Sequence, residues 1–147
     1  MAGAAHVIVR PMRSEDAPRV ANLTTQLGYP STDADISRRF QLIGERSDTR
    51  LFVAEENGRV VGWIHVQAAS LLECDARAEI WGLVVDQSAR GTGVGRRLVQ
   101  AAEDWARSRG LPSIALRSNQ RRTDAQGFYQ HLGYTITKTQ NAFRKSL

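Results

Sequence analysis

Hydrophobic positions in the first third of the chain follow a strand pattern and then two helical patterns. The β-branched run His6–Arg10 predicts a short strand, which Pro11 ends. Apolar residues then recur every three or four positions in two stretches, which predicts two helices closed by glycines. The positions are Ala17, Val20, Leu23 and Leu27 before Gly28, and Ile36, Phe40 and Ile43 before Gly44. Ser14 is expected to cap the first helix, and Ser31 or Thr32 the second.

The middle of the chain shows the pattern of three strands. Leu51–Glu55 and Arg59–Gln67 flank Asn57-Gly58, which is the strongest short signal for a β-hairpin. Ala76–Val85 has the length and composition of a third strand. Gly82 within it is consistent with a β-bulge that would separate this strand from its next neighbour.

The second half alternates between helices and strands. The loop Gln87–Gly93 precedes a predicted helix at Val94–Arg109 and a predicted strand at Leu111–Arg117. Thr123 and Gln126 fit a capping box that opens a second helix, which runs to Leu132. Two closing strands are expected at Tyr134–Thr137 and Ala142–Lys145. The order is β-α-α-β-β-β-α-β-α-β-β. It predicts one α/β (α+β) domain over residues 1–147, with a mixed, largely antiparallel central sheet, helices on both faces and one parallel crossover.

Composition places the chain among globular domains. It has 147 residues, of which 41% are hydrophobic and 24% charged, enough for one core. No apolar run approaches the roughly 20 residues of a membrane span, and the N-terminus lacks the pattern of a secretory signal. The single cysteine, Cys74, cannot form an internal disulfide. We therefore expect a soluble cytoplasmic domain with no membrane partner.

The net charge of +5 is divided unevenly along the chain. Residues 1–89 carry nine arginines against twelve acidic residues, a net charge of −3, whereas residues 90–147 carry eleven basic residues against three acidic ones, a net charge of +8. This asymmetry favours an anionic partner for the second half and tolerates a cationic one near the first. A solvated arginine surface is the simpler alternative.

The segment Arg90-Gly91-Thr92-Gly93-Val94-Gly95 joins a predicted strand to a predicted helix. Glycines there allow close backbone approach, and the free N–H groups of the loop and first helical turn form a site for phosphate. The residues after Gly93 are not the Gly-Lys-Ser/Thr of a nucleoside-triphosphate loop. The glycine spacing also differs from the G-x-G-x-x-G of dinucleotide-binding folds.

Arg90-x-x-Gly93-x-Gly95 resembles the Q/R-x-x-G-x-G/A loop of the GNAT superfamily, the acyl-CoA-dependent N-acetyltransferases. Asn119 and Phe128-Tyr129-x-x-Leu132-Gly133-Tyr134 are similar to the C-terminal signature of that family, and the element order matches its fold. The resemblance implies that acetyl-CoA is a co-substrate. No group of His, Cys and carboxylate residues shows metal-ligand spacing, so no metal is expected. The residues that the resemblance assigns to acetyl-CoA are Leu83, Val84, Val85, Arg90, Gly91, Thr92, Gly93, Val94, Gly95, Arg96 and Asn119.

Two residues are candidates for proton transfer. The resemblance implies that Tyr129 protonates the leaving thiolate, since the family places a tyrosine near the thioester sulfur. Glu79 is the candidate general base, because some family members carry a catalytic glutamate before the strand that binds pantetheine. The alternatives are a half-buried core tyrosine and a glutamate that pairs with an arginine. The resemblance also implies that the pantetheine arm lies beside Leu83–Val85, which makes a backbone N–H near Val84 the expected oxyanion donor.

Aromatic residues suggest where the acceptor binds. By strand alternation Trp81 shares a face with Glu79, and Trp63 shares one with His65 on the neighbouring strand. An aromatic and acidic wall suits a cation, and Tyr29 could close over it. Ordinary core packing explains the tryptophans equally well, and a histidine on a strand is more often structural.

The resulting hypothesis is an acetyl-CoA-dependent N-acetyltransferase that acts on a primary amine in a ternary complex. The alternative is a non-catalytic acyl-CoA sensor or interaction module on the same fold. Nucleic acid is not an expected partner, because no groove-reading motif accompanies the arginines. Dimerisation is common in the family, so a homodimer is a further expectation.

Overall fold

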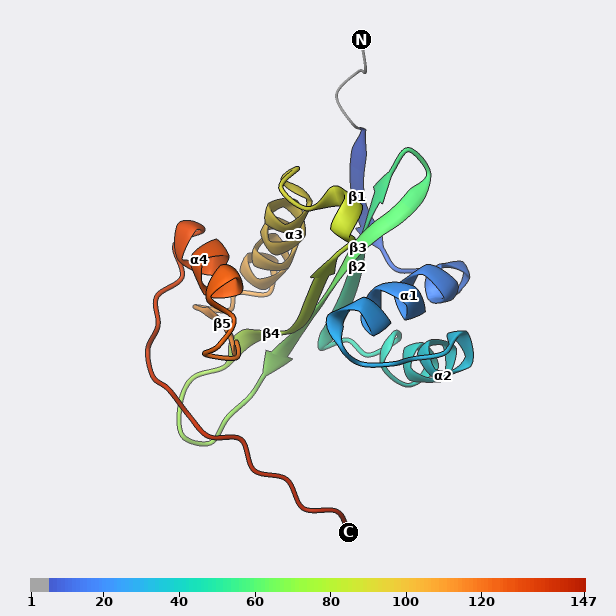
Figure 1. Ribbon diagram of the computed structural model, residues 1–147. Coiled ribbons are helices and arrows are strands. Elements are labelled where there is room, and N and C mark those ends of the chain that lie inside the picture. The colour runs from blue at the N-terminus through green and yellow to red at the C-terminus, as the bar shows by residue number, and fades with distance from the viewer. Residues whose placement is uncertain (1–5) are drawn as a thin grey trace. The chain divides into compact units, whose positions relative to one another are not determined.

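The computed structural model describes residues 6–147 and contains a five-stranded sheet in the order β1-β2-β3-β4-β5 (Figure 1). The strands are β1 (Val7–Pro11), β2 (Thr49–Glu56), β3 (Arg59–Ala69), β4 (Arg77–Val85) and β5 (Ile114–Leu116). The helices are α1 (Ala17–Leu27), α2 (Asp33–Ile43), α3 (Val94–Ser108) and α4 (Thr123–His131), with short 3-10 turns η1 (Ser14–Asp16) and η2 (Gln87–Ala89). Neighbouring strands are antiparallel except β4 and β5, which are parallel. The predicted mixed sheet with one parallel crossover is confirmed.

The chain divides into two compact units. The first ends at Leu116 and holds the sheet with α1, α2 and α3. The second, Arg117–Leu147, holds α4. The assignment of residues 1–147 to one domain stays a prediction.

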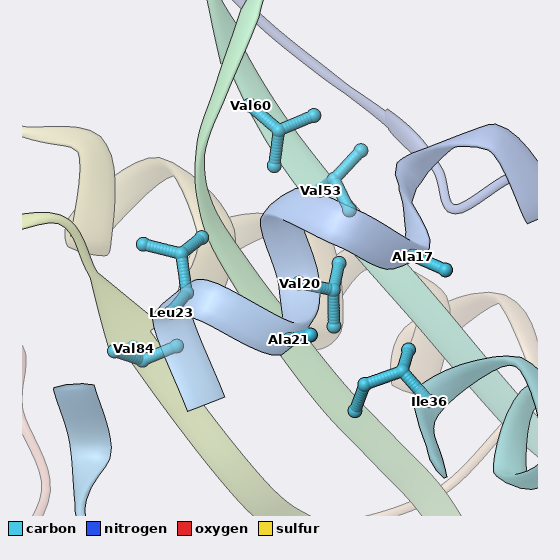
Figure 2. Packing of buried hydrophobic residues seen from close by; sticks show 8 residues of the cluster. All are labelled: Ala17, Val20, Ala21, Leu23, Ile36, Val53, Val60 and Val84. Atoms are coloured by element: carbon cyan, nitrogen blue, oxygen red, sulfur yellow. The ribbon is translucent and has the colours of Figure 1, made fainter. Parts of the chain in front are cut away.

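Helices cover both faces of the sheet within the first unit. Helices α1 and α2 lie on one face and α3 on the other (Figure 1). Figure 2 shows α1 directing Val20 and Leu23 toward the strands, where Val84 lies close to Leu23. On the α3 face, Gly62 allows close approach, because a Cβ atom there would lie 3.0 Å from Leu98 Cδ1. Burial of these apolar side chains on both faces provides most of the driving force for the fold.

The local signals for turns and caps are largely present. Gly28 ends α1 with φ +109°, and Asn57 and Gly58 turn the β2–β3 hairpin with φ +50° and +81°. Thr32 caps α2 by accepting a hydrogen bond from the backbone N–H of Asp35, whose carboxylate accepts one from the Thr32 N–H. This reciprocal pair satisfies two backbone donors of the kind that a helix start leaves unpaired.

A register change in β4 produces the β-bulge that Gly82 predicted. His65 of β3 faces Gly82, whereas Val66 faces Ile80, so Trp81 is the extra residue. A Cβ atom on Gly82 would lie 2.7 Å from the Trp63 ring, so this position needs glycine for packing rather than for a special φ. The bulge therefore fixes the Trp63 ring directly above the β4 backbone.

Three predictions about where elements form or begin are wrong. The closing strands at 134–137 and 142–145 are not formed: residues 134–147 carry no strand, and nearly all of them are exposed, so no sheet face is buried to hold a register. Thr123 is the first residue of α4 rather than its cap, and Arg122 precedes it without a side-chain cap hydrogen bond. Ser14 likewise lies inside η1, because Arg13 takes the cap position.

A partly buried ionic network ties β1 to the start of α1 and to β2. The Arg10 guanidinium donates to both oxygens of Asp16 at 2.8 and 2.9 Å and to Glu55 at 2.7 Å. Asp16 also accepts a hydrogen bond from the Arg13 backbone N–H. Burial alone would raise the pKa of Asp16, but the hydrogen bonds from Arg10 and Arg13 outweigh it and lower the pKa below its ordinary value.

Replacing Asp16 with Asn should destabilise the protein by about 2 kcal/mol at pH 7, because the partly buried Arg10 would lose one of its two carboxylate partners and keep only Glu55. A lowered folded-state pKa stabilises the fold above the unfolded value of about 3.9 and ceases to do so as pH falls through the folded value. The difference in free energy of unfolding between the parent protein and Asp16→Asn, measured by urea unfolding, should therefore narrow below about pH 4. The exposed Asp33→Asn control should change stability by less than about 0.5 kcal/mol. A gap independent of pH would contradict the ionic explanation.

Candidate functional site

The strand β4 leads through η2 and a glycine loop into the N-terminus of α3. Gly91 and Gly93 adopt φ +77° and +88°, and Gly93 is the cap residue of α3 without a side-chain cap hydrogen bond. The first turn of α3 contains no acidic residue. The N–H groups at this helix start are therefore left to an external acceptor, and the helix dipole favours an anion there.

Side chains around the loop divide into those that hold it and those left exposed. The Thr92 hydroxyl donates to the Ala89 carbonyl and closes the turn. Arg90 donates from Nε to the Val85 carbonyl at 3.3 Å, which keeps its exposed side chain beside the end of β4. Arg96 is exposed in the first turn of α3, whereas Arg97 donates to the Val7 carbonyl at 2.6 Å. Arg90 and Arg96 therefore add positive charge beside the helix start.

The C-terminal part of β4 has one paired edge. Strand β5 pairs only with Ala78–Ile80, whereas Leu83–Val85 pair with β3 alone among the described residues. Asp86 anchors the end of β4, because its carboxylate accepts from Arg19 at 2.9 Å and its backbone N–H donates to the Val61 carbonyl at 2.7 Å. The remaining edge of Leu83–Val85 offers backbone groups of the kind that an extended ligand pairs with.

Glu79 is buried in β4, opposite Gln67 of β3. Arg77 donates to its Oε1 atom from Nε at 3.1 Å and from Nη2 at 3.0 Å. Glu79 therefore pairs with an arginine, as expected if its role is structural rather than catalytic. Both hydrogen bonds reach the same oxygen of the carboxylate.

Two adjoining cavities lie between α1, α2 and the sheet. The larger, of about 460 Å³, is lined by Thr24, Leu27, Gly28, Tyr29, Pro30, Ser31, Arg39, Trp63, Trp81 and Gly82. The smaller, of about 170 Å³, is lined by Met12, Val20, Thr24, Ile36, Arg39, Phe40, Ile43, Leu51, Phe52, Trp63, Ile64 and His65. Each of the four predicted acceptor residues lines at least one cavity: Tyr29 and Trp81 the larger, His65 the smaller and Trp63 both. Their role in binding stays a prediction.

Two polar atoms at these cavities are buried without a partner among the described residues. They are the indole Nε1 of Trp63 and the imidazole Nε2 of His65. Burial lowers the pKa of His65, so its ring is neutral at pH 7. A buried indole N–H without an acceptor is costly to the fold.

Tyr129 and Asn119 belong to the second unit. The Tyr129 ring makes edge contacts with Phe128 and Tyr134 at centroid distances of 5.1 and 5.8 Å. Burial raises the pKa of Tyr129 to about 12, against a smaller lowering by Arg122. Asn119 organises the turn before α4 by accepting the Arg121 backbone N–H at 2.9 Å. Because its pKa is raised, the Tyr129 phenol stays protonated at physiological pH, as a general acid must.

The sequence pattern did not single out Arg39, which lines both cavities. Arg39 lies three residues after Ile36, at the edge of the apolar stripe of α2, and this spacing is the sequence signal that could have identified it.

Among residues 6–147, no cluster of three His, Cys, Asp or Glu side chains could hold a metal ion. None of the described helices is both long enough and apolar enough to cross a membrane.

Known proteins share both the sequence pattern and the fold. The chain is 33% identical over 131 residues to the mycothiol acetyltransferase of Thermobispora bispora, a match that covers 85% of this chain and 44% of that protein. It is 29% identical to glucosamine 6-phosphate N-acetyltransferase 1 of Oryza sativa subsp. japonica, covering 90% and 83% of the two chains. The chain thus spans less than half the length of its mycothiol acetyltransferase relative.

Solved structures with the same fold include an aminoglycoside N-acetyltransferase in complex with CoA, with a TM-score of 0.87, 22% identity and coverage of 100% and 99% of the two chains. Glucosamine-6-phosphate N-acetyltransferase from Arabidopsis thaliana aligns with a TM-score of 0.82, 23% identity and coverage of 96% and 99%. The sequence model of the acetyltransferase (GNAT) family matches residues 16–134. Because this match spans most of the chain, the protein belongs to the acetyltransferase (GNAT) family.

Proposed function

We propose that the protein is an N-acetyltransferase that moves the acetyl group of acetyl-CoA directly to a primary amine in a ternary complex. One observation carries the proposal: the singly paired edge of Leu83–Val85 runs into the glycine loop and the uncapped start of α3. An acyl-CoA molecule combines an extended amide-bearing arm with a pyrophosphate. The strand edge and the helix start complement these two parts in the same order along the chain.

Donor binding in this proposal relies mainly on backbone groups. The amides of the pantetheine arm pair with Leu83–Val85 as an added strand would. The pyrophosphate accepts hydrogen bonds from the N–H groups between Gly91 and Gly95, and Arg90 and Arg96 add positive charge. Asn119 is assigned to the donor by family resemblance alone.

The transfer itself requires three proton or charge events. The amine must lose a proton, for which Glu79 is the proposed acceptor, before its nitrogen attacks the thioester carbon. A backbone N–H near Val84 stabilises the resulting oxyanion. As the C–N bond forms and the C–S bond breaks, the thiolate takes the proton of the Tyr129 hydroxyl, a role that family resemblance alone assigns to Tyr129. The former amine nitrogen gives its second surplus proton to solvent, the Tyr129 phenolate regains a proton from solvent and Glu79 releases its own, so the products are the amide and CoA.

Gly93→Ala should weaken acetyl-CoA binding about tenfold in calorimetric titration, because the left-handed backbone at the start of α3 would be strained and the N–H groups misdirected. Gly110→Ala is the matched control: Gly110 follows the other end of α3 with φ +70°, and at both glycines an added Cβ atom would meet nothing within 4 Å. Both variants should lose similar stability, and only Gly93→Ala should lose affinity. Equal affinity in the two variants would argue against the loop as the donor site.

Tyr129→Phe should lower kcat by about 100-fold while leaving acetyl-CoA affinity nearly unchanged, because only the acidic proton is removed. The neighbouring Tyr134→Phe is the control and should retain near-normal turnover. Release of the CoA thiol in the presence of a panel of amines measures both variants. An acyl-CoA sensor would instead bind acetyl-CoA and release no thiol with any amine, which would remove the catalytic proposal.

Glu79→Gln should lower kcat by about 100-fold at neutral pH, because the amide cannot take the amine proton. Arg77→Gln is the comparison, since it breaks the same ion pair but keeps the carboxylate. If Glu79 serves only as the partner of Arg77, both variants will lose stability alike and neither will lose turnover selectively. Steady-state kinetics and urea unfolding on the two proteins separate these outcomes.

A further inference from the structure

The charge around the two cavities is not what a cationic acceptor needs. Among residues 6–147, no aspartate or glutamate lines either cavity, and Arg39 is the one charged side chain common to both. Glu79, the acidic residue expected beside the acceptor, is engaged by Arg77 and is absent from both linings. The sequence-based expectation of an aromatic and acidic wall therefore lacks its acidic part in these cavities.

Arg39 is exposed, like its neighbour Arg38, but its side chain lines both cavities and is available to an anion there. Its Nη1 atom donates to the Ser31 hydroxyl at 3.0 Å, and that hydroxyl donates to the Tyr29 carbonyl at 2.9 Å. The Ser31 backbone N–H donates to the Thr25 hydroxyl at 3.1 Å, which fixes the connection between α1 and α2. No carboxylate among the described residues forms an ion pair with Arg39. A guanidinium has five N–H donors, so most of its capacity remains for a ligand.

The rest of the lining suits an apolar or aromatic body. The smaller cavity is walled largely by aliphatic and aromatic side chains, and Trp63 belongs to both cavities. The Trp63 Nε1 atom is buried without a partner among the described residues and exposes almost no surface, so the ring contributes an apolar wall rather than a donor. Charge and apolar wall thus converge on one kind of molecule.

We infer that the acceptor is a primary amine that carries both an oxyanion, carboxylate or phosphoryl, and an apolar or aromatic side group. The oxyanion pairs with Arg39, the side group occupies the apolar cavity, and the amine faces the β4 side near Gly82. This inference rests on the proposed acetyltransferase function and narrows its substrate class. A polyamine would bring additional positive charge beside Arg39, which the cavities do not balance.

The inference can be tested with a matched set of amines on the full chain in the presence of CoA. Phenethylamine has the ring without an anion, L-phenylalanine adds a carboxylate, and 1-amino-2-phenylethylphosphonic acid carries a phosphonate instead. L-Alanine keeps the carboxylate without the ring, and spermidine is the polycation. Calorimetry gives the Kd of each amine for the parent protein and for two variants, Arg39→Gln and Arg38→Gln. Arg38 is the control, because it is exposed, pairs with Asp35 and lines neither cavity.

At least one of the two anionic phenyl compounds should bind about tenfold more tightly than phenethylamine, and the tighter one identifies the oxyanion. L-Alanine and spermidine should bind more weakly than either. Arg39→Gln should remove the advantage of the anion without changing the Kd of phenethylamine, and Arg38→Gln should preserve it. Equal binding of charged and uncharged phenyl compounds, equal effects of the two arginine variants, or no saturable binding of any amine would overturn the inference.

A separate titration with acetyl-CoA distinguishes this failure from failure of the proposed function. If acetyl-CoA binds and Gly93→Ala weakens it while the amines show no dependence on Arg39, the donor site stands and the acceptor class is wrong. If acetyl-CoA does not bind the parent protein, the proposed function itself fails.

Discussion

The register change at Trp81 in β4 is the constraint on which both sides of the candidate site depend. The change inserts one residue opposite the His65–Val66 step and brings Gly82 against the Trp63 ring. A Cβ atom on Gly82 would lie only 2.7 Å from that ring. Beyond this bulge β4 continues along β3 and leaves β5, which pairs only with Ala78–Ile80. One inserted residue therefore supplies an aromatic wall on one face and, toward the loop, a strand edge that no other described strand pairs with.

The two ends of the site use different chemistry. At the donor end, the proposed ligand groups are backbone N–H and C=O, so in this proposal the left-handed glycines at positions 91 and 93 set the geometry of binding. At the proposed acceptor end, side chains from α1, α2 and the sheet line the cavities, and in the proposal their character sets which amine fits.

Much of the fold follows from short sequence signals because those signals act locally. The Asn57-Gly58 turn, the Thr32 cap and the glycines around α3 adopt the backbone that their residue types favour. The closing strands at 134–137 and 142–145 were wrong because a strand needs a partner and a buried face, and neither is encoded in the segment itself. Tyr129 and Asn119 came from resemblance, and their roles stay predictions.

The family loop, the strand-to-helix turn and the glycine that the bulge requires could all be predicted from the sequence, since each depends on a few adjacent residues. The pairing of charged side chains, and which of them reach the cavities, became known only from the folded chain. Glu79 stands beside Trp81 in the pattern, yet Arg77 holds it through Oε1, and Arg39, distant in sequence from both, supplies the charge of the cavities. Long side chains on different elements meet only when the chain folds, so their electrostatic roles cannot be read from spacing alone.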